Sequence, residues 1–119
     1  MTTGIIVFAH GSRDPQWRLP IEAVARQIME RQPGTLVRCA YLELCLPSLP
    51  DAAIELIAAG ARKIRVFPLL LGVGKHARED LPLLISELRT AHPDIVVKLL
   101  PTAGESDKLI ALMADIALS

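Results

Sequence analysis

Four apolar segments rich in β-branched residues alternate along the chain with four segments whose apolar residues recur every three or four positions. The apolar segments are Gly4–Ala9, Leu36–Leu42, Lys63–Leu70 and Ile95–Leu100. Each is nearly continuous in apolar character, as strands are when helices cover both faces of their sheet. The alternation therefore predicts an α/β fold, a single βαβαβαβα domain with a four-stranded parallel sheet covered by helices on both faces.

The four helical segments each present one apolar face at helical spacing. These faces are formed by Trp17, Ile21, Val24, Ala25 and Ile28 in the first segment, Leu56 and Ile57 in the second, Leu84, Ile85 and Leu88 in the third, and Leu109, Leu112, Met113 and Ile116 in the fourth. Ser48 is placed to cap the second helix and Gly60 to end it. Pro82 fits a helix best in its first turn, so Asp80 is expected to be the N-cap of the third helix.

The length and charge of the chain limit the classes of function that it can have. With 119 residues it has room for one folded domain, which we expect to span residues 1–119. Its 13 basic residues balance 13 acidic ones and only 3% of the residues are aromatic, so it lacks the basic field and the stacking side chains of nucleic-acid-binding proteins.

Its apolar runs are too short to span a membrane and its N-terminus has no secretory pattern. We therefore expect a cytoplasmic protein that binds neither nucleic acid nor membranes.

The two cysteines carry no recognisable motif. Cys39 and Cys45 are six positions apart, which matches neither a CxxC redox motif nor a paired zinc site. We interpret them as reduced thiols without a chemical role.

The polar residues that follow the predicted strands are the candidates for chemistry, because parallel α/β sheets bind ligands where the carboxyl ends of their strands meet. His10 follows the first strand, Glu43 follows the second, and His76 lies in the loop after the third. Imidazole is a good ligand for Fe, Co, Ni and Zn, so two histidines on adjacent loops predict an open transition-metal site, with Glu43 as a carboxylate at the same edge. His92 precedes the fourth strand and is expected at the opposite edge.

Basic residues gather around both histidines although the chain as a whole is electroneutral. Arg13 follows His10, and Lys75 and Arg78 flank His76. Clustered positive charge favours a small polyanionic ligand. Asp80 lies four positions after His76; besides the expected helix cap, orientation of His76 remains open as a role for this residue.

Two alternatives to a metal-dependent enzyme remain open, and a third is excluded. A phosphate-binding Walker A loop around Gly74–Lys75 is excluded. It needs a glycine at position 69 and a hydroxyl at position 76, where the chain has Leu69 and His76. A phosphohistidine-type phosphatase that uses His10 stays open as one alternative, although such enzymes have an arginine before that histidine and the chain has Ala9 there. The other open alternative is a non-enzymatic transition-metal carrier that uses His10 and His76.

Three segments, in order along the chain, resemble the motifs of the small class II sirohydrochlorin chelatases. They are HGSRD at His10–Asp14, YLE at Tyr41–Glu43 and GKHAREDLP at Gly74–Pro82. The family pattern is an HGSRD-like segment, a Glu in a short hydrophobic context, and GxHxxxD(I/L)P. The match runs through the whole chain with fitting spacing, which makes it far more specific than any one motif.

The resemblance implies a chelatase-like fold and the insertion of a divalent metal into sirohydrochlorin, on the route to cobalamin or sirohaem. Co²⁺ is expected first, Fe²⁺ next and Ni²⁺ third, each as a substrate, and no tightly bound cofactor is implied. His10 and His76 correspond to the histidines that bind the metal in that family. Glu43 corresponds to its Glu, which assists metal binding or proton removal. The expected catalytic residues are thus His10, His76 and Glu43.

The resemblance also implies a ligand for the basic cluster, sirohydrochlorin, and a partner for the chain, a second copy of itself. Sirohydrochlorin is rich in carboxylates, so Ser12, Arg13, Lys75 and Arg78 are the expected substrate-binding residues. Many members of the family hold two such domains in one chain. This chain is similar to the short form, half of that architecture, and is expected to pair as a homodimer.

Overall fold

The central sheet is built as the alternating pattern predicts. In the computed structural model, which describes residues 2–119, four parallel strands lie in the order β2-β1-β3-β4. The strands are β1 (Thr3–Ala9), β2 (Leu36–Tyr41), β3 (Lys63–Pro68) and β4 (Val96–Leu99). Each strand end lies within two residues of its predicted position. The parallel α/β sheet is therefore confirmed.

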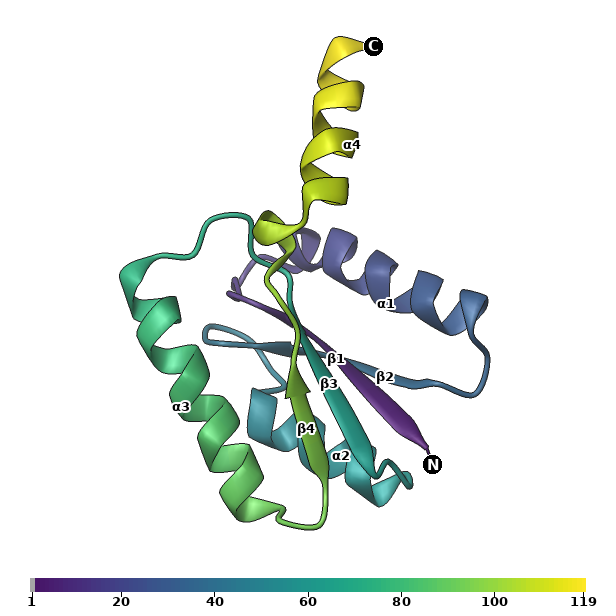
Figure 1. Cartoon of the computed structure of the whole chain (residues 1–119), viewed down its shortest axis with the longest axis vertical. Coiled ribbons are helices and arrows are strands. Elements are labelled where there is room, and N and C mark those ends of the chain that lie inside the picture. Colours follow the sequence, from purple (N-terminus) through teal and green to yellow (C-terminus); the bar gives the residue numbers. More distant parts are fainter. Residues whose placement is uncertain (1) are drawn as a thin grey trace.

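Helical segments connect these strands and follow the last one (Figure 1). They are η1 (Pro15–Arg18), α1 (Leu19–Arg31), α2 (Leu49–Ala58), α3 (Lys75–Ala91), η2 (Ala103–Glu105) and α4 (Asp107–Leu118). The predicted cap of α2 is confirmed, because the Ser48 hydroxyl accepts a hydrogen bond from the Asp51 N–H at 3.3 Å. Among residues 2–119, no helix combines the length and the apolar character that crossing a membrane requires.

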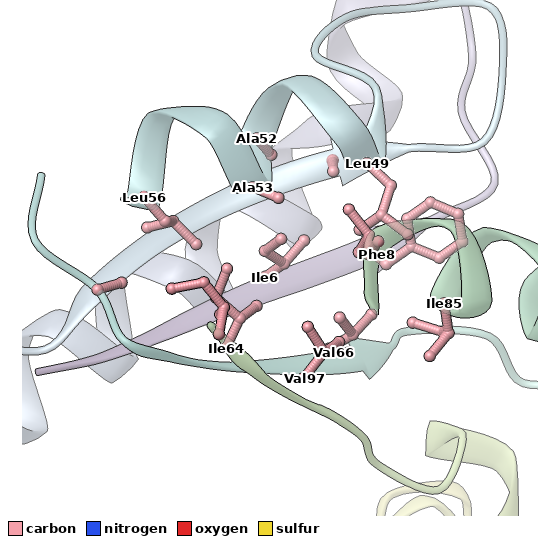
Figure 2. Close-up of a cluster of buried hydrophobic side chains, with 14 of the residues drawn as sticks. Ile6, Phe8, Leu49, Ala52, Ala53, Leu56, Ile64, Val66, Ile85 and Val97 are labelled. Carbon is pink, nitrogen blue, oxygen red and sulfur yellow. The ribbon is translucent and has the colours of Figure 1, made fainter. Parts of the chain in front are cut away.

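Two apolar clusters hold the helices against the sheet. Figure 2 shows the larger one, in which α2 and α3 pack against one face of the sheet. Its labelled members are Ile6, Phe8, Leu49, Ala52, Ala53, Leu56, Ile64, Val66, Ile85 and Val97. On the opposite face, Ile21 and Ala25 of α1 pack with Val7 and Val37. Helices thus cover both faces, and the carboxyl ends of the strands remain open.

The fourth helix lies differently from what its apolar face suggests. α4 extends beyond the carboxyl edge of the sheet and away from the rest of the chain (Figure 1), and none of its residues is buried. Leu112, Met113 and Ile116 are exposed to solvent. The helix therefore does not cover the sheet of its own chain, and α1 alone covers the second face.

The predicted N-cap of α3 is wrong. The helix begins at Lys75 with Gly74 as its N-cap, so Asp80 lies in the second turn and Pro82 lies inside the helix. A proline within a helix removes one backbone hydrogen bond and destabilises the helix by about 3 kcal/mol. Leu81 and Ile85 on either side of it are buried in the core. The packing of these two side chains offsets the cost of the proline, so tertiary contacts rather than the helix propensity of the segment decide where α3 begins.

Tyr41, at the end of β2, is expected to make stability fall at high pH. Its ring packs near Trp17 at a centroid distance of 6.1 Å. Burial, with smaller effects of Cys39, Cys45 and Glu22, raises the pKa of Tyr41 to about 12. Since the unfolded value is about 10, the unfolded chain releases this proton first as the pH rises. The contribution of Tyr41 is complete below pH 10 and is lost by about pH 12, which lowers the free energy of unfolding by about 2 to 3 kcal/mol.

Urea unfolding at a series of alkaline pH values measures this loss, and Tyr41→Phe is the control that removes it. Because the chain has one tyrosine, the ultraviolet absorbance of tyrosinate reports Tyr41 alone. Ionisation near pH 10 in the folded protein would contradict the prediction.

Candidate functional site

The candidate site is built where the pairing of β1 and β2 continues past the ends of the strands. The Leu42 N–H donates to the Ala9 carbonyl at 3.0 Å, and the Glu43 N–H donates to the His10 carbonyl at 3.1 Å. The second of these bonds places residues 10 and 43 next to each other at the carboxyl edge of the sheet. The His10 Nε2 and the Glu43 Oε1 are 2.9 Å apart, and their side chains are 53% and 55% exposed. Two of the three predicted catalytic residues are therefore in direct contact and open to solvent.

Gly11 allows the two loops to approach each other. Its φ is +110°, in the region that favours glycine, and a Cβ at this position would overlap the carbonyl oxygen of Glu43. The sequence singled out this segment for its polar residues and missed the role of its glycine. The available signal was a glycine directly after a candidate ligand at the end of a strand.

A tight turn follows Glu43 and holds its backbone in place. The Cys45 N–H donates to the Glu43 carbonyl at 2.9 Å, and Leu44 between them has a φ of +69°. A non-glycine residue in this conformation is strained by about 1 to 2 kcal/mol. The strain is local to the candidate site, and the turn fixes Glu43 between two backbone hydrogen bonds.

The chemistry of a carboxylate decides which His10 nitrogen is free. An ionised carboxylate can only accept hydrogen bonds, so the hydrogen between His10 and Glu43 belongs to Nε2. In a neutral imidazole, Nδ1 then carries the free lone pair. A carboxylate that accepts from the second ring nitrogen is the usual partner of a metal-binding histidine. Glu43 thus orients His10, and Nδ1 is available to a metal ion or a proton.

His76 lies outside this pair. It is an exposed residue in the first turn of α3, and its side chain has no hydrogen bond to His10, Glu43 or Asp80 in the part of the chain that the structure describes. Within residues 2–119, no three His, Cys, Asp or Glu side chains are grouped as a ready metal site. The structure therefore brings together His10 and Glu43, and a metal site that includes His76 stays a prediction.

The loop after β1 uses two of its polar side chains for its own structure. The Asp14 N–H donates to the Ser12 hydroxyl at 3.1 Å, and the Gln16 N–H donates to the Asp14 carboxylate at 3.0 Å, which caps η1. Arg13 lies between them and is exposed. Ser12 therefore shapes the loop that presents Arg13, and substrate contacts of both residues stay predictions.

A cavity lies between the start of α3 and the loop after β4. Its volume is about 350 Å³, and Arg78 and Glu105 supply charged groups among apolar side chains that include Val73 and Pro82. The Gly104 N–H donates to the Leu70 carbonyl at 2.9 Å, which ties the loop after β4 to the loop after β3. The cavity can hold an apolar group with an acidic substituent beside Arg78.

The third histidine lies where the sequence places it. His92 is the C-cap residue of α3, and its carbonyl accepts a hydrogen bond from the Ile95 N–H just before β4. This position is the amino edge of the sheet, opposite His10 and Glu43. Its predicted position at the opposite edge of the sheet is confirmed.

Comparison with known proteins identifies the family. The family model named CbiX matches residues 4–117. The chain belongs to the CbiX family. A curated relative, the chloroplastic sirohydrochlorin ferrochelatase of Arabidopsis thaliana, is 29% identical over 112 residues, which are 94% of this chain and 50% of the relative. The curated relatives that it matches are longer, and the chain spans 50% to 62% of their lengths.

Solved structures show the same fold. A CbiX protein from Marinobacter aquaeolei VT8 matches with a TM-score of 0.83 and 30% identity, over 98% of this chain and 94% of that one. The sirohydrochlorin chelatase SirB from Bacillus subtilis subspecies spizizenii, in complex with cobalt, matches with a TM-score of 0.78 and 26% identity, over 98% of this chain and 52% of SirB. The CbiX chain therefore corresponds to nearly all of one neighbour and to about half of the other.

Proposed function

We propose that this protein inserts a divalent metal, Co²⁺ first and Fe²⁺ next, into sirohydrochlorin in cobalamin or sirohaem biosynthesis. The observation that carries the proposal is the His10–Glu43 contact of 2.9 Å at the open carboxyl edge of the sheet. Membership of the CbiX family supports the reaction, and the relatives named above are described with iron in one case and cobalt in the other.

Metal insertion needs a weak metal site and a base. The ion must lose water and reach the macrocycle from one face, and two pyrrole N–H protons must leave as the metal enters. His10, whose ring is held by Glu43, binds the metal through Nδ1, and His76 on α3 supplies the second imidazole of the metal site. Two imidazoles without a closed ligand set leave coordination positions open, as transfer of the ion requires. His10, His76 and Glu43 are the candidates for proton acceptor.

The charged residues around the site suit a substrate that carries many carboxylates. Arg13, Lys75 and Arg78 are exposed at the same edge, and Arg78 also lines the 350 Å³ cavity. Guanidinium groups bind carboxylates in a bidentate manner. We assign Arg13, Lys75 and Arg78, together with Ser12, to the acidic substituents of the macrocycle.

The length of the relatives supports pairing of two copies. SirB is about twice as long as the matched region, because this chain covers 52% of it. We propose that residues 1–119 form one domain that corresponds to half of such a protein, and that a homodimer supplies the other half. The two cysteines are free, which agrees with the cytoplasm as the compartment.

The reaction is tested by mixing the purified protein with sirohydrochlorin and Co²⁺ or Fe²⁺ and following the absorbance of the macrocycle. Insertion faster than with the metal alone is expected. His76→Ala should slow insertion by about 10-fold to 100-fold, which is the range for disturbed metal sites. His92→Ala is the matched control and should keep the parental rate. Metal binding without faster insertion would indicate a metal carrier and would overturn the enzyme proposal.

A further inference from the structure

A cavity of about 610 Å³ lies along the outer edge of the sheet, and none of the predicted catalytic residues lines it. β2 is the last strand of the sheet on this side, with β1 as its one neighbour, and α1 lies alongside it (Figure 1). Residues of both elements line the cavity, together with Leu46 and Pro47 from the loop after β2. We call this cavity the β2 groove.

The outer edge of β2 offers hydrogen-bonding groups to the groove. Successive residues of a strand turn their N–H and carbonyl groups to opposite sides. The Leu42 N–H donates to a carbonyl of β1, whereas the Tyr41 N–H donates outwards to the Pro47 carbonyl at 2.9 Å. By this alternation, Cys39 turns its N–H and its carbonyl outwards, and within residues 2–119 neither has a backbone partner on that side. Free groups of this kind are a template for pairing with another extended segment.

Arg38 limits what can pair with this edge. Its guanidinium donates to the outward-facing Val37 carbonyl at 2.9 Å, and it pairs with the Glu55 carboxylate of α2 at 3.5 Å. One acceptor of the edge is thus occupied, and the centre of the edge at Cys39 stays open. Because α1 and α2 flank the groove on the two faces of the sheet, a single extended segment fits between them better than a second sheet with helices of its own.

Three charged side chains stand in a row on the α1 wall of the groove. They are Arg18, the N-cap residue of the helix, Glu22 and Arg26. Each is four positions from the next, so they share one helix face and span about 12 Å along its axis. None of the three has an ion pair within residues 2–119. In an extended chain, alternate side chains point to the same side, and five residues span about 13 Å. The row of charges therefore has the repeat of an extended segment.

We infer that the β2 groove binds an extended segment of a partner protein in which acidic, basic and acidic residues alternate with uncharged ones. The segment adds a strand to β2 and exchanges hydrogen bonds with the N–H and the carbonyl of Cys39. Its two acidic side chains pair with Arg18 and Arg26, and the basic side chain between them pairs with Glu22. Main-chain hydrogen bonds give such a contact affinity, and alternate side chains give it specificity. The inference does not depend on the proposed function, because the groove contains none of the catalytic candidates.

The probe for this inference is the dye-labelled peptide TETKTET, whose charge pattern reads the same in both directions and so serves parallel and antiparallel pairing. Fluorescence anisotropy at low ionic strength should show saturable binding to the whole chain, about 10-fold tighter than binding of TKTETKT, in which all three charges are reversed. Arg26→Glu should weaken the binding of TETKTET by about 5-fold to 10-fold. Arg31→Glu is the matched control, because it makes the same change on α1 outside the groove and should keep the parental affinity. Circular dichroism verifies that both variants are folded.

Exchange of charges across the contact separates the alternating pattern from a general attraction of anions. In TETKTKT and TKTKTET, one of the two acidic residues is replaced by lysine. One of these two peptides should recover the parental affinity for Arg26→Glu and the other should not, which also gives the direction of the added strand. In the parent chain, bound TETKTET should slow hydrogen exchange of the Cys39 N–H, measured by NMR, by about 10-fold or more.

The competing occupants of the groove give different results. Displacement of TETKTET by citrate at a similar concentration would indicate a site for small anions. Protection of the Cys39 N–H in the chain alone that rises with protein concentration would indicate a second copy. Either result would overturn the inference, as would equal affinity for TETKTET and TKTETKT, unchanged exchange at Cys39, or recovery with neither peptide. Arg26→Glu should keep the parental rate of metal insertion, so a parent chain that binds TETKTET without inserting metal would contradict the proposed function alone.

Discussion

Replacing His10 with alanine is expected to lower the rate of metal insertion by about 100-fold or more, the range over which a general base or a metal-orienting group acts. The substitution removes Nδ1 as a ligand and leaves Glu43 without its partner. It should scarcely change stability, because the His10 side chain is half exposed and its contact with Glu43 is a surface hydrogen bond worth about 0 to 1 kcal/mol. Rates of insertion and urea unfolding, measured on the same preparation, separate the two effects.

Glu43→Gln is the conservative companion of this variant. Glutamine keeps the size and can still accept a hydrogen bond from Nε2, but its neutral amide no longer attracts the metal-bound form of His10. An intermediate loss of about 10-fold to 100-fold in apparent metal affinity is expected, as for carboxylates that orient metal-binding histidines. If His10→Ala retained the parental rate of insertion, the assignment of the site to this edge of the sheet would be wrong.

Gly11→Ala is expected to lower the free energy of unfolding by about 2 to 4 kcal/mol and to slow metal insertion at the same time. Two effects add at this position. An alanine at a φ of +110° is strained, and its methyl group would overlap the Glu43 carbonyl. Relief of that overlap moves the loop after β2 away from the loop after β1, which separates His10 from Glu43.

Gly60→Ala is a matched control for the strain alone. Gly60 has a φ of +109°, nearly the same as Gly11, but a Cβ there would meet no atom within 4 Å. It should destabilise by about 1 kcal/mol and leave insertion unchanged. Equal effects of the two substitutions, measured by urea unfolding and by insertion rate, would show that the approach of the loops is unimportant.

The sequence was sufficient for the sheet because buried strands leave a direct signal. Continuous apolar segments marked all four strands, and the cap at Ser48 followed from one hydroxyl and its spacing. The start of α3 was not predictable in this way, because burial of Leu81 and Ile85 decides whether a helix can tolerate Pro82. The outward course of α4 was equally hidden, since an apolar helical face does not say whose surface it covers.

The candidate site, too, could be predicted from the sequence only in part. Motif position was enough to bring His10, Glu43 and His76 to one edge of the sheet. The direct contact between His10 and Glu43 depends on the hydrogen bonds that join the loops after β1 and β2, and the loops approach this closely because Gly11 has no side chain.

The exposure of the His10–Glu43 pair has a consequence for how this protein can change. Because the pair adds little to folding, either side chain can be exchanged for another ligand or base without endangering the fold. The backbone beneath it has no such freedom, since Gly11 and the turn at Leu44 set the spacing of whatever side chains stand at positions 10 and 43. In the proposed metal site, ligand chemistry and stability are thus separable, the first adjustable at the tips of two side chains and the second fixed in the main chain below them.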